Sequence, residues 1–258
     1  MAGHSKWANI KRQKARVDAA KGKVFTRISR EIIVAARTGG ADPAGNFQLR
    51  TAIDKAKAAG IPNDNIDRAI AKGAGTLADD EAALEAIRYE GYGVAGVAVL
   101  IEGLTDNRNR TAADLRSAFS KNGGNLGETG CVSWMFDQKG VVTLSGPIDE
   151  DKLLEASVAG EAESYELTPV DDTETEGAEV FTEVSHLEQL NQVLQDGGFK
   201  VIQAELRWIP NNTVEVEDIE KARSILKLMD ALDDLDDVQN VTANFEMSES
   251  CYQALEAE

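Results

Sequence analysis

Val141-Val142-Thr143-Leu144 begins a stretch, residues 141–207, in which strand and helix periodicities alternate. After this apolar strand, the pattern predicts a helix at 152–159, strands at 164–168 and 179–184, a helix at 187–195 and a strand at 200–207. The order βαββαβ is typical of a ferredoxin-like sandwich. We therefore expect residues 135–207 to form one α/β domain.

The segments on either side predict a second α/β domain. Upstream lie a buried strand at 97–101 and a helix at 107–122; downstream lie a strand at 213–216, a helix at 219–235 and a strand at 241–246. We expect these two halves to combine into a discontinuous domain, residues 77–134 plus 208–258, into which residues 135–207 are inserted. A short strand at Trp134-Met135-Phe136 fits either domain.

The first 76 residues predict a separate all-helical domain. Apolar residues recur every three or four positions from Val24 to Ala36, and Gly39-Gly40 ends that helix. Asp42-Pro43 is expected to open a second helix with Leu49, Ala52, Ile53 and Ala56 buried, and Pro62 a third with Ile66, Ala69 and Ile70 inward. The expected fold class is therefore α+β: an N-terminal three-helix domain followed by two ferredoxin-like α/β domains, one inserted in the other.

The net charge of −18 conceals a strong separation of charge. Residues 1–80 hold 15 Lys and Arg against 8 Asp and Glu, a net of +7, so the remaining residues carry −25. A basic module joined to acidic domains favours binding to a polyanion, although a solvated basic face gives the same count. The aspartates at 230, 233, 234, 236 and 237 are interpreted as the solvated face and end of a helix.

The bases concentrate ahead of and along the first helix, where Trp7 is interleaved with them. Affinity for phosphates arises from several spaced cations that release counterions. Trp7 could stack on an exposed base or anchor the basic arm to the helices. The candidate nucleic-acid-binding residues of this region are Lys6, Trp7, Lys11, Arg12, Lys14, Arg16, Lys21, Lys23, Arg27 and Arg30.

The motifs that resemble those of enzymes lack the neighbouring elements or residues that catalysis or cofactor binding needs. Gly91-Tyr92-Gly93-Val94-Ala95-Gly96 matches G-x-G-x-x-G but opens a strand instead of a helix, so we interpret it as a hairpin turn. The two histidines, His4 and His186, are too few for a zinc site or a histidine-based triad. We expect no catalytic residues, no metal and no cofactor.

Other features indicate an intracellular protein. The longest apolar run, residues 94–101, has the length of a strand and not of a membrane span. Cys131 and Cys251 form no disulfide framework, which suits a reducing compartment. We expect a cytoplasmic protein without membrane contact.

Several long motifs resemble the YebC/PmpR family along essentially the whole chain. The opening Gly3-His4-Ser5-Lys6-Trp7-Ala8-Asn9-Ile10-Lys11, the run Ile61-Pro62-Asn63-Asp64-Asn65-Ile66, Tyr89-Glu90-Gly91-Tyr92-Gly93 and Leu104-Thr105-Asp106-Asn107-Arg108-Asn109-Arg110-Thr111 carry the resemblance. Members are described as probable transcriptional regulatory proteins that bind DNA, and they include mitochondrial translational activators. The resemblance implies an all-helical first domain and two α/β domains.

Arg108 and Arg110 are two further candidates for contact with nucleic acid. If Asp106 caps the helix that follows, both arginines lie near its positive end, where a phosphate would suit them. Pairing with carboxylates of the acidic domains is the alternative.

Three functions remain after these observations. The first is a DNA-binding transcriptional regulator; the second is a ribosome-binding or RNA-binding translation factor that contacts ribosomal RNA and basic ribosomal proteins. The translation factor is mildly favoured, because no helix displays the cluster of Arg, Asn and Gln that direct base readout needs. A protein-interaction adaptor is the third, and it leaves the basic tract without a role.

Overall fold

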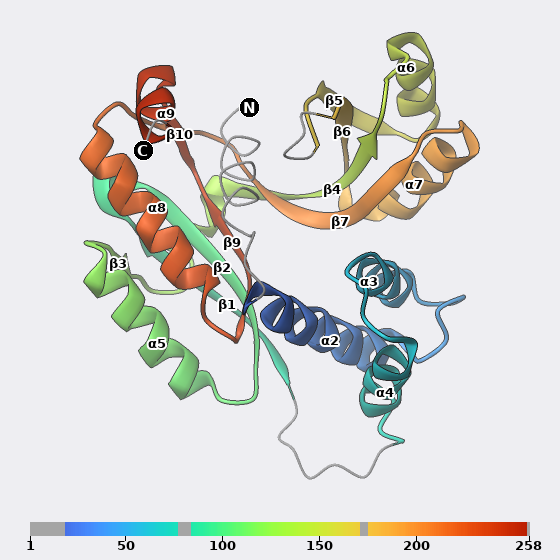
Figure 1. Ribbon diagram of the computed structural model, residues 1–258, viewed down its shortest axis with the longest axis horizontal. Coiled ribbons are helices and arrows are strands. Elements are labelled where there is room, and N and C mark those ends of the chain that lie inside the picture. Colours follow the sequence, from blue (N-terminus) through green and yellow to red (C-terminus); the bar gives the residue numbers. More distant parts are fainter. Residues whose placement is uncertain (1–18, 77–83, 171–174, 257–258) are drawn as a thin grey trace. The chain divides into compact units, whose positions relative to one another are not determined.

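The computed structural model describes residues 19–76, 84–170 and 175–256 and confirms the α+β class (Figure 1). The chain divides into two compact units. Among the described residues, the first unit comprises 19–136 and 210–256, and the second comprises 137–209. The second unit therefore interrupts the first in sequence.

Three helices open the first unit: α2 (Ala19–Gly39), α3 (Phe47–Ala58) and α4 (Asn63–Gly73). The predicted apolar faces form their common core, which includes Ile32, Leu49, Ala56 and Ile66. At Gly73, a Cβ atom would clash with the carbonyl oxygen of Ile33. Only glycine lets α4 approach the backbone of α2 this closely.

The predicted start of the second helix is wrong. Asn46, and not Asp42, is the N-cap of α3, and its Oδ1 accepts from the backbone N–H of Leu49 at 3.0 Å. The Nδ2 of Asn46 also donates to the carbonyls of Ala35 and Gly40, both at 2.8 Å. Asn46 therefore satisfies the end of α2 and the start of α3 together, whereas the Asp42 side chain accepts from Ala44 N–H within its own turn.

The first unit also contains a four-stranded antiparallel sheet in the order β3-β1-β2-β9. Its strands are β1 (Glu85–Tyr92), β2 (Ala98–Thr105), β3 (Asn125–Leu126) and β9 (Val238–Ala243). Tyr92 pairs with Ala98, and the turn between them places Ala95 and Gly96 at positive φ. The glycine-rich motif is therefore a hairpin turn, as predicted.

Two helices, α5 (Arg108–Lys121) and α8 (Ile219–Asp233), pack beside each other on this sheet (Figure 1). The Phe119 ring of α5 lies so close to Gly91 of β1 that a Cβ there would be 2.6 Å from it. The unit is completed by β8 (Val214–Val216), which pairs in parallel with β10 (Phe245–Met247), and by α9 (Glu249–Glu256). The sequence patterns missed β1, β3 and α9.

The second unit has the predicted βαββαβ order. Its elements are β4 (Phe136–Ser145), α6 (Glu150–Ala159), β5 (Ala162–Leu167), β6 (Gly177–Thr182), α7 (Leu187–Asp196) and β7 (Val201–Pro210). The sheet order β5-β6-β4-β7 places the first and third strands at its centre, as in a ferredoxin-like sandwich. The Trp134-Met135-Phe136 strand was not predicted correctly, because Ser133–Met135 forms a 3₁₀ turn and β4 begins at Phe136.

Candidate nucleic-acid interface

Part of the predicted interface falls outside the residues that the structure describes. Lys6, Trp7, Lys11, Arg12, Lys14 and Arg16 precede the first described residue, and Lys21 belongs to α2 without a described side chain. Their role stays a prediction. Lys23, Arg27, Arg30, Arg108 and Arg110 are described, and all five form ion pairs within the first unit.

Lys23, Arg27 and Arg30 share one face of α2, because they are four and three residues apart. The first two meet the C-terminal end of α8. Lys23 Nζ donates to the carbonyl and to Oδ1 of Asp234 at 2.8 and 3.0 Å. Arg27 donates to the carbonyl and to Oδ1 of Asp233 at 2.8 and 3.2 Å. The end of a helix has unpaired carbonyls and a partial negative charge, so cations bind there favourably.

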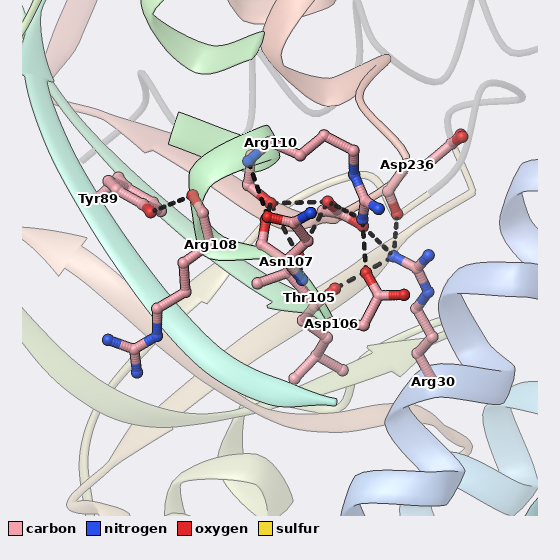
Figure 2. A network of polar contacts seen from close by, with 11 residues as sticks. Arg30, Tyr89, Thr105, Asp106, Asn107, Arg108, Arg110 and Asp236 are labelled. Carbon is pink, nitrogen blue, oxygen red and sulfur yellow. Dashed lines mark hydrogen bonds and ion pairs between the residues drawn. The ribbon is translucent and has the colours of Figure 1, made fainter. Parts of the chain in front are cut away.

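Arg30 reaches the turn between α8 and β9 (Figure 2). Its Nη1 donates to Oδ1 of Asp237 at 2.9 Å, to the carbonyl of Asp236 at 2.7 Å and to the carbonyl of Leu104 at 3.1 Å. One guanidinium thus ties α2 to the end of β2 and to the start of β9.

Asp237 is the centre of this network and is only 5% exposed. Besides Arg30, it accepts from Arg110 Nη2 at 2.8 Å and from the hydroxyls of Thr111 and Thr105 at 2.7 and 3.1 Å. The interpretation of Asp237 as a solvated residue at a helix end is therefore wrong. The helix ends at Asp233, and the turn that follows directs the Asp237 carboxylate inward.

The network shifts the pKa values of its charged groups. Burial raises the pKa of the Asp237 carboxyl, but the hydrogen bonds from Arg110, Thr111, Arg30 and Thr105 outweigh burial, and the net pKa lies below the ordinary value. Hydrogen bonds to Asp237 and Asp106 raise the pKa of Arg110 further. Both shifts favour the charged forms of Asp237 and Arg110 at neutral pH.

The helix that carries Arg108 and Arg110 has a different cap from the predicted one. Asn107, and not Asp106, is the N-cap of α5, and its Oδ1 accepts from Arg110 N–H at 3.1 Å. Asp106 instead accepts from the Arg110 side chain at 2.7 Å. Arg108 pairs with Glu85 at 2.6 Å, but both side chains are more than half exposed. In this structure both arginines therefore pair with carboxylates, which was the alternative to a phosphate contact. The phosphate contact stays a prediction.

A second buried carboxylate, Glu90 of β1, organises the loop that follows β3. Its two oxygens accept from the backbone N–H groups of Gly130, Val132 and Ser133 at 2.7–2.8 Å, and it is 2% exposed. Burial raises the pKa of Glu90, yet these backbone hydrogen bonds outweigh it and hold the pKa below the ordinary value. Nothing in the sequence pattern singles Glu90 out, because its partners lie forty or more positions away.

The structure therefore defines an α+β protein in which basic helices are tied by ion pairs to an acidic α/β part. Family models place it more narrowly: the TACO1/YebC protein N-terminal domain matches residues 5–76, and the TACO1/YebC second and third domain matches residues 84–245. The chain belongs to the TACO1/YebC family, which confirms the resemblance found in the sequence.

Similar proteins cover almost the whole chain. A protein of Trichormus variabilis is 75% identical over 250 residues, 97% of each chain, and one of Trichodesmium erythraeum is 71% identical over 255 residues, 99% of each chain. Both are named "Probable transcriptional regulatory protein". A solved structure, the conserved hypothetical protein Aq1575 of Aquifex aeolicus, is 44% identical with a TM-score of 0.81 and covers 91% of this chain and 94% of its own.

Proposed function

We propose that this protein is a nucleic-acid-binding regulator of gene expression that acts without catalysis. Its relatives are named as transcriptional regulatory proteins, and we propose DNA as the target. The observation that carries the proposal is the separation of charge. Residues 1–80 carry a net charge of +7 and the remainder −25, so the N-terminal region is the part whose net charge attracts a polyanion.

Within this proposal the basic residues fall into two groups. Lys6, Lys11, Arg12, Lys14 and Arg16 supply phosphate contacts ahead of α2, and Trp7 stacks on an exposed base. Lys23 extends this surface, because its ion pair with Asp234 is exposed, with 47% and 76% of the two side chains accessible. Exposed pairs of this kind contribute about 0–1 kcal/mol, so a phosphate can replace the carboxylate.

Arg30 and Arg110 have a structural role in this proposal. Their shared partner, the Asp237 side chain, is 7% exposed, so a phosphate would have to leave that charge buried and unpaired. Arg27 lies between the two groups, with its side chain 20% exposed against Asp233.

A translation factor that binds ribosomal RNA is the alternative. One observation on α2 favours it. Arg27 and Arg30 bind carboxylates and carbonyls, so they are not presented to base edges. Binding to the backbone of a folded RNA needs cations but no such base-reading side chains.

Cross-linking in cells tests the proposal and separates its two forms. Ultraviolet cross-linking, purification of the protein and sequencing of the attached strand identify the nucleic acid directly. Recovery of specific promoter DNA supports a transcriptional regulator, and recovery of ribosomal RNA supports the alternative. Recovery of neither, with a known DNA-binding protein cross-linked in the same cells as control, contradicts the proposed function.

A further inference from the structure

The loop from Gly127 to Met135 lies on the surface, yet several hydrogen bonds to Glu90 fix its backbone. Glu90 binds three of its backbone N–H groups, and the carbonyl of Glu90 accepts a fourth, from Gly127, at 2.8 Å. Val132 is fully buried beneath the loop. Such a loop is preorganised, so a residue that it displays reaches a partner with little loss of conformational entropy.

The residue displayed by this loop is Trp134, which is 67% exposed. Its indole N–H donates to the carbonyl of Cys131 at 3.1 Å, and the hydroxyl of Tyr92 donates to the same carbonyl at 2.9 Å. The ring is thereby oriented, and its one polar group is already satisfied. What it offers a partner is therefore the π surface of the indole.

The segment that carries Trp134 has a negative net charge. Residues 125–136 contain Glu128 and no Lys or Arg, and Glu128 forms no ion pair with another residue of the described part of the chain. Burial, Glu90 and Glu128 together raise the pKa of the Cys131 thiol, as expected where a second negative charge is unfavourable. Cys131 relates the two residues, because the Glu128 charge acts on its thiol and its carbonyl accepts from the Trp134 indole. An exposed aromatic face and an exposed carboxylate on the same loop attract a cation by two independent effects.

We propose that Trp134 and Glu128 form a binding site for an arginine side chain of a positively charged partner protein. A guanidinium stacks on the indole and pairs with the Glu128 carboxylate, which an ammonium does less well because it is not planar. Tryptophan and arginine are also the residue types that dominate the binding energy of protein interfaces.

A nucleobase fits this position less well than an arginine. Stacking of a base would bring its phosphates toward Glu128, on the part of the chain that carries −25. The site is thus independent of the proposed nucleic-acid-binding residues and belongs to a separate interaction of the acidic part.

Fluorine NMR of the full chain labelled with 5-fluorotryptophan tests the proposal. The protein has three tryptophans, so Trp→Phe variants assign the three signals. The probes are acetylated, amidated triarginine and the uncharged analogue tricitrulline. We expect triarginine to shift the Trp134 signal saturably and tricitrulline to leave it in place.

Two matched variants localise the effect. Glu128→Gln should weaken triarginine binding at Trp134 by about threefold, as loss of one exposed charge pair predicts. Glu155→Gln removes an exposed carboxylate from α6 and should leave the affinity measured at Trp134 nearly unchanged. The proposal is overturned if the Trp134 signal does not move, or if both peptides shift it equally. It is also overturned if both variants have equal effects, or if a single-stranded oligonucleotide shifts the signal in place of triarginine.

Discussion

Arg30 and Asp237, which are 207 positions apart in the sequence, are joined by a hydrogen bond of 2.9 Å between Nη1 and Oδ1. Both side chains are largely inaccessible, at 19% and 7%. The pair connects the first described helix to the strand that closes the sheet of the first unit. The pair thereby links the basic helix α2 to the α/β part of the first unit.

Asp237→Asn should destabilise the first unit. The substitution removes the negative charge that neutralises Arg30 and Arg110 and replaces an acceptor with an amide, so we expect a loss of about 2–4 kcal/mol in the free energy of unfolding. Urea denaturation followed by circular dichroism measures it. Asp236→Asn is the control, because Asp236 contributes its carbonyl to Arg30 and its side chain is exposed. Equal stabilities of the two variants would contradict the role assigned to Asp237.

Stability should fall in acid through Asp237 and Glu90. Both have pKa values below those of the unfolded chain, which are about 3.9 and 4.3 for Asp and Glu. Their stabilising contribution is therefore complete above these unfolded values and is lost as the pH falls through the folded ones. The stability difference between the wild type and Asp237→Asn should be constant near neutral pH and should shrink below about pH 4. A difference that persists unchanged at pH 3 would mean that the Asp237 charge is not its source.

Glu90→Gln should loosen the loop that displays Trp134. Three backbone N–H groups lose a charged acceptor, so amide hydrogen exchange of residues 130–133 should quicken by about tenfold or more, corresponding to 1–3 kcal/mol. Mass spectrometry of peptic peptides reports the rate, with the peptides of α7 as an internal reference. Unchanged exchange at residues 130–133 would show that the loop is held by other contacts.

Neutralising Asp233 and Asp234 should strengthen binding to nucleic acid. Their carboxylates compete with phosphates for Arg27 and Lys23, so Asp233→Asn with Asp234→Asn should raise the affinity by about threefold to tenfold. Asp151→Asn with Glu155→Gln changes the net charge equally on the exposed side of α6 and is the matched control. Fluorescence anisotropy with a labelled 20-nucleotide duplex measures both. Equal gains would assign the effect to net charge and not to competition.

The bases ahead of α2 should determine the salt dependence of binding. Replacing Lys11, Arg12 and Lys14 together by Gln should flatten the slope of log affinity against log salt by roughly two to three units on duplex DNA. The loss should be nearly equal for all base sequences, because phosphate contacts carry no sequence information. Anisotropy titrations at four salt concentrations give the slope. An unchanged slope would assign these residues to contacts within the protein.

The structural features that depend on residues close together in the sequence could be predicted from it. The spacing of Leu49, Ala52, Ile53 and Ala56 predicted the buried face of α3, and the alternation in residues 141–207 predicted the elements of the second unit. β1 was missed because Glu85, Arg88 and Glu90 interrupt its apolar residues, so it lacks an apolar run. The two caps were misplaced by a few residues because Asp and Asn both occur nearby, and the choice depends on a third group, such as the carbonyl of Ala35 for Asn46.

The candidate site was less predictable than the fold. Its arginines were predicted from their charge, but the buried carboxylates Asp237 and Glu90 were not. Both are identified only by hydrogen bonds to residues far away in sequence. A carboxylate among several in an acidic turn carries no local sign that it is buried.

The interruption of the first unit also dictates an order of events during synthesis. β2 pairs with β9 from Val99 with Ala243 to Gly103 with Val238, so residues 238–243 must leave the ribosome before the sheet can close. By then residues 137–209, the whole described part of the second unit, have already been synthesised. A chain that terminates before residue 238 presents the apolar β2 as an open edge, a template for aggregation.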